Sequence, residues 1–188
     1  MESLSVPMQI EELFSDLPAF AQLAAGLSIE DYQPKLFDFF HYPFGVFWLG
    51  VPKAQVNSVR EAFAALFLLN LHHNQGWIYN EAQRTNSDQF IIDRLPKEQW
   101  KQLLQDKWII ENFNLPLRQL KITPLKIADF SQKFLCWKPE HVNTEGWRNL
   151  ERVVSSSLWV YSLFSNNYDL YFGQTAEHYF FAESGVYD

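Results

Sequence analysis

The sequence predicts an α+β fold with a central buried helix over about residues 53–73, an aromatic β-hairpin before it, a C-terminal antiparallel β-meander after it, and helices covering one face. Residues 62–69 are apolar at every position, so this helix needs cover on most of its sides. Residues 35–51 hold two aromatic and β-branched runs around a Pro/Gly turn. Three similar runs, separated by turn residues, follow from residue 158 onward, which predicts the meander.

The segment before the hairpin predicts short helices. Residues 8–27 read as two of them, broken near residues 16–18, with the second ending at Gly26. Ser28 followed by Asp31 resembles a capping arrangement for one further helical turn. These pieces are expected to serve as scaffolding.

The middle of the chain mixes polar, helical and basic stretches. Residues 80–89 are the most polar and predict a loop, which makes them a candidate functional edge. Residues 96–108 have the spacing of an amphipathic surface helix. Residues 115–139 contain three prolines, which predict short strands or turns.

The last part of the chain predicts one helix and three strands. Asn143 or Thr144 can cap a helix that ends in the serines of 155–157. The predicted meander strands are 158–164, 168–172 and 177–182, with turns at 165–167 and 173–175.

Composition indicates one globular domain over residues 1–188. The hydrophobic fraction of 47% is enough for a substantial core. Aromatic residues make up 17% of the chain, which is more than a core requires, so some rings are expected at a contact surface.

The formal net charge of −7 is unevenly distributed, with no lysine or arginine in residues 1–34 or after Arg152. This acidity disfavours non-specific nucleic-acid binding and suits a basic protein partner. The basic stretch 118–138 offers Phe130, Phe134 and Trp137 as rings on which bases could stack. Its charges are widely spaced, which favours a solvated face instead.

Cysteine content and the first residues indicate a cytoplasmic protein. The single cysteine, Cys136, cannot form an internal disulfide, and its Phe and Trp neighbours predict burial. The first residues have no basic region followed by a long apolar core, so no signal peptide is expected. Nor is a membrane-spanning segment expected.

Motifs for several large enzyme classes do not occur in the sequence. These are the dinucleotide, P-loop, α/β-hydrolase and kinase motifs. His72 and His73 are adjacent and diverge by about 100° on a helix, so they do not form a helical metal pair. We expect them in the last turn of the central helix, and we expect no metal or cofactor.

Two functional hypotheses follow. The first is a non-catalytic protein-binding or inhibitory module, of the bacterial immunity-protein type, that binds a basic partner through an acidic and aromatic surface. Its residues are the exposed members of the set Tyr161, Tyr168, Asp169, Tyr171, Glu177, Tyr179 and Glu183. A homo-oligomer is also compatible with the sequence.

The alternative is a small metal-independent enzyme or ligand-binding domain with a pocket between the hairpin and the meander. Its candidate residues are Asp38, His41, Glu177 and His178. Neighbours in this set diverge along a strand, so the pocket depends on tertiary convergence.

Overall fold

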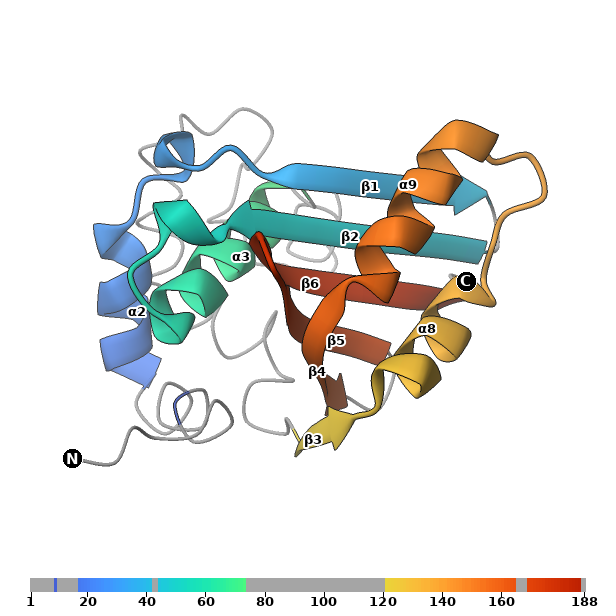
Figure 1. Cartoon of the computed structure of the whole chain (residues 1–188). Coiled ribbons are helices and arrows are strands. Elements are labelled where there is room, and N and C mark those ends of the chain that lie inside the picture. Colours follow the sequence, from blue (N-terminus) through green and yellow to red (C-terminus); the bar gives the residue numbers. More distant parts are fainter. Residues whose placement is uncertain (1–8, 10–16, 42–43, 74–120, 165–168, 187–188) are drawn as a thin grey trace, which may run out of the picture.

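A computed structural model describes Gln9 and residues 17–41, 44–73, 121–164 and 169–186 of the 188-residue chain. Its centre is a six-stranded sheet in the order β1-β2-β6-β5-β4-β3, with every neighbouring pair antiparallel (Figure 1). The strands are β1 (Lys35–His41), β2 (Phe44–Pro52), β3 (Lys121–Leu125), β4 (Ser157–Phe164), β5 (Asp169–Thr175) and β6 (His178–Val186). The predicted α+β class, the hairpin and the C-terminal meander are confirmed.

Helices pack on both faces of this sheet. They are α2 (Leu17–Gly26), α3 (Val59–His73), α8 (Ile127–Leu135) and α9 (Thr144–Ser155), with 3-10 turns at Ile29–Asp31 and Lys53–Gln55. Helices α2 and α3 belong to one hydrophobic cluster and α8 and α9 to another, on opposite faces of the sheet (Figure 1). We call these the α3 face and the α8–α9 face.

The sequence predicted that helices cover one face, whereas the predicted helix that became α9 lies with α8 on the face opposite α3. Helix α8 itself was not recognised. It lies in the basic stretch whose prolines predicted strands or turns, and in the described part of that stretch β3 forms around Pro124 while turn residues lie at 136–137 and 140–141, on either side of Pro139. Residues 127–135 contain no proline, and Phe130 and Phe134 stand four residues apart, on one side of a helix. Both rings are fully buried, so they hold α8 against the sheet.

Helix α3 begins later than predicted, at Val59 rather than near residue 53, because its N-terminus is fixed by a local capping arrangement. The Ser58 hydroxyl accepts a hydrogen bond from the Glu61 backbone N–H at 3.1 Å. The Glu61 carboxylate in turn accepts from the Asn57 N–H at 3.1 Å. These bonds satisfy donors at the helix start that have no partner within the helix.

The predicted burial of the central helix is confirmed. Every residue from Ala62 to Leu69 is buried, between the sheet and α2. The Phe63 ring, for example, meets Phe172 at a centroid distance of 5.1 Å and Phe181 at 4.9 Å. Helix α3 is therefore anchored to the meander as well as to the hairpin that precedes it.

Helix α9 begins where the sequence predicted. The Asn143 side chain accepts hydrogen bonds from the backbone N–H groups of Glu145 and Gly146, at 3.0 and 3.3 Å. Trp147, Leu150 and Val154 then bury the inner side of the helix.

Two glycines inside strands make room for aromatic rings on the α8–α9 face. A Cβ added at Gly50 would lie 2.3 Å from the Trp48 ring, and one added at Gly173 would lie 2.4 Å from the Phe180 ring. The sequence predicted a turn at 173–175, but β5 continues through Gly173 to Thr175. Here glycine serves close ring packing rather than a change of chain direction.

Some sequence predictions lie outside the described residues: the loop at 80–89, the helix at 96–108 and the turn at 165–167. Within the described part of the chain, no helix has the length and apolarity needed to cross a membrane.

Candidate protein-binding face

Three half-buried aromatic side chains form a row on the α3 face: Trp159 and Tyr161 on β4, and Tyr179 on β6. The ring centroids of Trp159 and Tyr161 are 5.4 Å apart, and those of Trp159 and Tyr179 are 6.2 Å apart. Strand alternation produces this arrangement, because residues two apart on a strand point to the same side of the sheet. We call these three residues the aromatic row.

Contacts with Phe172 and Gln174 hold the aromatic row in place. The buried Phe172 ring meets Trp159 edge-on at 5.4 Å and stacks on Tyr179 at 6.4 Å. The indole Nε1 of Trp159 donates a hydrogen bond to the Gln174 side chain at 3.0 Å. These contacts fix the orientation of the rings, and a side chain that is already fixed loses little rotamer entropy in any further contact.

Charged groups border the row at its Tyr179 end. The Lys53 ammonium lies 5.9 Å from the Tyr179 ring centroid. The Lys53 backbone N–H donates to the Glu177 carbonyl at 2.8 Å, which places the exposed Glu177 beside this end of the row. Glu183, further along β6, pairs in register with the buried Phe47 and therefore faces the same side of the sheet.

The structure brings together only part of the predicted binding set. Tyr161 and Tyr179 lie in the aromatic row, with Glu177 next to it and Glu183 on the same face. Tyr171 is not an exposed ring, because it is buried on the opposite face, 5.0 Å from Phe130. The remaining members cannot be placed: Tyr168 and the Asp169 side chain lie outside what the structure describes. Trp159 was missed, although its alternation with Tyr161 was a readable signal.

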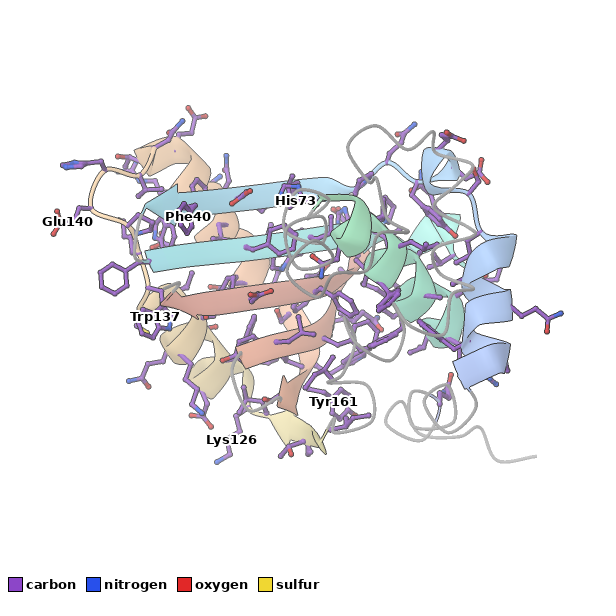
Figure 2. The ribbon with its side chains drawn as sticks, turned by 180° about the vertical axis from the view of Figure 1, so that it is seen from behind. Phe40, His73, Lys126, Trp137, Glu140 and Tyr161 are labelled. Carbon is purple, nitrogen blue, oxygen red and sulfur yellow. The ribbon has the colours of Figure 1, made fainter. Side chains whose placement is uncertain are left out.

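A histidine–carboxylate pair lies on the same face, where the C-terminal end of α3 meets β1 (Figure 2). The His73 Nε2 is 2.9 Å from the Asp38 Oδ2. The His73 ring also packs on Phe47 at a centroid distance of 5.0 Å. The sequence predicted His73 in the last turn of the helix, which is correct, but no local pattern pointed to Asp38 as its partner.

The residues of the alternative pocket are divided between the two faces. Asp38 pairs in register with Phe47, which belongs to the α3 face. The ring of His178 instead meets Trp48, a member of the α8–α9 cluster, at 6.1 Å. Asp38 and His178 therefore do not line one pocket. Glu177 lies in the turn before β6, and the His41 side chain is outside what the structure describes.

The environment of His178 favours its neutral form. Burial lowers the pKa of this imidazole below its ordinary value of 6.5, and the positive charge of Lys35 lowers it further. Glu177 acts in the opposite direction and does not reverse the shift.

Of the three rings in the basic stretch that could stack on bases, only Trp137 is partly exposed to solvent. Phe130 and Phe134 are buried on the inner side of α8, and Trp137 is half-buried, with its ring centroid 5.7 Å from that of Phe44. Cys136 was predicted to be buried but is exposed, since it follows the last turn of α8 and its thiol donates to the Lys133 carbonyl at 2.9 Å.

No group of three or more potential metal ligands occurs among the described residues. A shallow hollow of about 530 Å³ lies along the outer side of α9 and contains none of the predicted pocket residues. It is lined by Arg148, Glu151, Arg152, Ser155 and Ser156. Comparison of the chain with protein-family models, with curated proteins and with solved structures gave no match.

Proposed function

We propose that this protein is a non-catalytic protein-binding or inhibitory module that recognises a basic partner, in the manner of bacterial immunity proteins, in a reducing cytoplasmic compartment. The observation that carries the proposal is the aromatic row of Trp159, Tyr161 and Tyr179, which is half-buried and already held by contacts with the core. Pre-organised tyrosine and tryptophan rings are the side chains that most often dominate the free energy of protein association.

The acidic charge would supply the other part of recognition. With a net charge of −7, the protein attracts a basic partner over distances of about a Debye length, roughly 8–10 Å at physiological salt. Glu177, in the turn before β6, and Glu183, on β6, would then act near the contact. Steering of this kind raises the association rate constant and makes it salt-dependent, while the rings slow dissociation.

The proposal is tested by affinity capture from the native source at low and at high salt, followed by measurement of binding to the isolated partner. We expect one basic partner, captured near stoichiometrically at low salt and less efficiently at high salt. Replacing Tyr161 or Tyr179 by alanine is expected to weaken its binding about 30-fold, the effect of losing about 2 kcal/mol. The matched control is Trp137→Ala, a half-buried ring on the other face of the molecule.

The electrostatic part has its own pair of variants. Glu177→Gln is expected to lower the association rate constant and flatten its salt dependence, while Glu140→Gln, an equal change of charge in the connection between α8 and α9, leaves both nearly unchanged. If both glutamines behave alike, recognition does not use charge at this face. If neither tyrosine variant weakens binding, the aromatic row is not the contact.

A second candidate function is a ligand-binding domain or small enzyme, and the pair of Asp38 and His73 is the observation that favours it. A carboxylate that holds an imidazole nitrogen fixes the orientation of the ring and leaves its other nitrogen for proton transfer. Its test is a small-molecule screen by NMR that follows the His73 ring signals. A compound that shifts these signals in the native protein but not in Asp38→Asn would support this function, and a screen in which no compound does so would count against it.

A further inference from the structure

Strand β1 forms one edge of the sheet, and the direction of its backbone groups can be read from the ladder. The Lys53 N–H donates to the Glu177 carbonyl, so odd-numbered residues at this end of β2 direct their backbone groups to β6 and even-numbered residues direct theirs to β1. Through the register that pairs Phe37 with the even-numbered Trp48, odd-numbered residues of β1 bond to β2. The backbone groups of the even-numbered residues, Leu36 and Asp38 among them, therefore point to the outer edge.

The two edges of the sheet differ in how they are protected. Edge strands are normally shielded by shortness, proline, a bulge or charged side chains. The opposite edge, β3, is five residues long and contains Pro124, which has no N–H to offer. Strand β1 has seven residues without proline, and its register with β2 runs unbroken from Lys35 to His41. In the described part of the chain no strand pairs with its outer edge.

The side chains on the α3 face of β1 alternate apolar, acidic, apolar. Leu36 is 44% exposed, the Asp38 side chain 43% and Phe40 60%. On the other side of the strand, Phe37 and Phe39 are half-buried and pack against Trp48 and Trp147. One side of β1 thus anchors the strand to the core, and the other presents two large apolar groups around a carboxylate that His73 holds in place.

We propose that β1 is the site at which an extended segment of the partner protein adds a seventh strand to the sheet. The segment carries a lysine or arginine opposite Asp38, with apolar side chains two residues away on each side to meet Leu36 and Phe40. Cross-strand neighbours of opposite charge stabilise a sheet, and apolar pairs do the same. This inference rests on the proposed function, since it names how the basic partner is held.

A second copy of this chain is a poorer occupant. Two β1 strands related by a two-fold axis through Asp38 would place the two Asp38 carboxylates directly opposite each other, and such like-charge pairs are destabilising. The basic segment instead places unlike charges there.

The test follows backbone amide exchange by NMR in the native protein with a capped probe peptide of sequence TITKTIT, which alternates as the proposal requires. We expect its addition to slow exchange of the outward-facing amides of Leu36 and Asp38 by more than about tenfold. The amides of Phe37 and Phe39, already directed to β2, should change little. Contact through side chains alone would leave the outward amides unprotected, and absence of protection at millimolar peptide would overturn the proposal.

Charge reversal provides the matched comparison. Asp38→Lys should weaken binding of TITKTIT and strengthen binding of TITETIT, each by roughly 3- to 30-fold, while Glu140→Lys changes neither. Because Asp38→Lys also removes the contact with His73, its fold is checked by circular dichroism, and Leu36→Pro serves as a second variant that removes an outward N–H at the edge. Equal affinity of both peptides for the native protein would refute the role given to Asp38.

The captured partner separates this inference from the proposed function. If partner binding is weakened by Tyr161→Ala but not by Leu36→Pro, the protein is a binding module and strand addition is wrong. If no basic partner is captured and neither peptide binds, both proposals fail. Self-association that is abolished by Leu36→Pro, seen by analytical ultracentrifugation, would replace the basic segment with a second copy of the chain.

Discussion

Replacing Gly173 with alanine tests whether the α8–α9 face depends on an aromatic ring lying directly over the backbone of β5. The new Cβ would lie 2.4 Å from Cζ of Phe180 and 2.9 Å from the backbone carbonyl oxygen of Trp159. Ordinary contacts begin near 3.4 Å, so the ring would have to move by about 1 Å. Phe180 is fully buried and stacks on Trp48 at 5.3 Å and on Phe130 at 5.9 Å, which leaves it no free space.

The expected cost follows from these contacts. Inserting a methyl group into a close-packed core costs about 1–3 kcal/mol, and a site blocked by both a buried ring and a backbone atom belongs at the upper end. Alanine also restricts the unfolded chain more than glycine does, which stabilises the folded protein by about 0.4–1 kcal/mol and offsets part of this cost. We therefore expect Gly173→Ala to lower the free energy of unfolding by about 2 kcal/mol, and Tm by about 4–8 °C for a domain of this size.

Thermal and urea denaturation of matched variants measure the effect. Gly185→Ala is the control, because a Cβ at this position on β6 meets no atom within 4 Å. It should match or slightly exceed the native protein in stability. Combining Gly173→Ala with Phe180→Leu should cost less than the sum of the two single changes, because the smaller side chain vacates the space. If Gly173→Ala and Gly185→Ala have the same Tm, the packing argument is wrong.

Three further predictions concern local contacts. Asn143→Ala removes the N-cap of α9 and should lower the free energy of unfolding by about 1 kcal/mol in urea denaturation, without loss of the native fold. Burial, helped by the negative charge of Glu61, raises the pKa of Tyr32 to about 12, so its ultraviolet titration should lie well above that of an ordinary tyrosine. The stabilisation it gives is complete below about pH 10 and should be lost between about pH 10 and 12, whereas Tyr32→Phe shows no such loss. The pKa of His178 in the folded protein lies below 6.5, so the contribution of its neutral form to the free energy of unfolding is present above about pH 6.5 and should be lost as the pH falls. The stability of His178→Gln should be less sensitive to acid. In the native protein, the NMR titration of the ring should lie below the ordinary value. A ring titration at or above the ordinary value would contradict the burial of His178.

The sequence was enough to predict the elements that are specified by local patterns of residues. The hairpin was readable from two runs of β-forming residues around a Pro/Gly turn, and α9 from Asn143 followed by apolar residues at helical spacing. The start of α3 was predicted about six residues too early, because Ser58 and Glu61, which form the cap that sets it, were not read as a start signal. Helix α8 was missed because prolines outside it outweighed a helical pattern only nine residues long.

The candidate site was predictable only in part, for a related reason. Tyr161 and Tyr179 were found because aromatic residues recur in the meander, but only the pairing of β4, β5 and β6 brings them together through Trp159. The pair of Asp38 and His73 joins an edge strand to the end of a helix. No periodicity connects such positions, because their contact is made by the packing of α3 across the sheet.

The pairing of β2 with β6 also has a consequence for how the chain is made on the ribosome. The inner edge of β2 is completed only when the last strand, His178–Val186, has been synthesised. At about 5–20 residues per second, the interval from Pro52 to His178 takes roughly 6–25 s, and the apolar side chains of β2 lack their final neighbours throughout it. Nascent chains stalled before His178 should therefore engage chaperones or aggregate, and release from them should coincide with emergence of β6 from the exit tunnel.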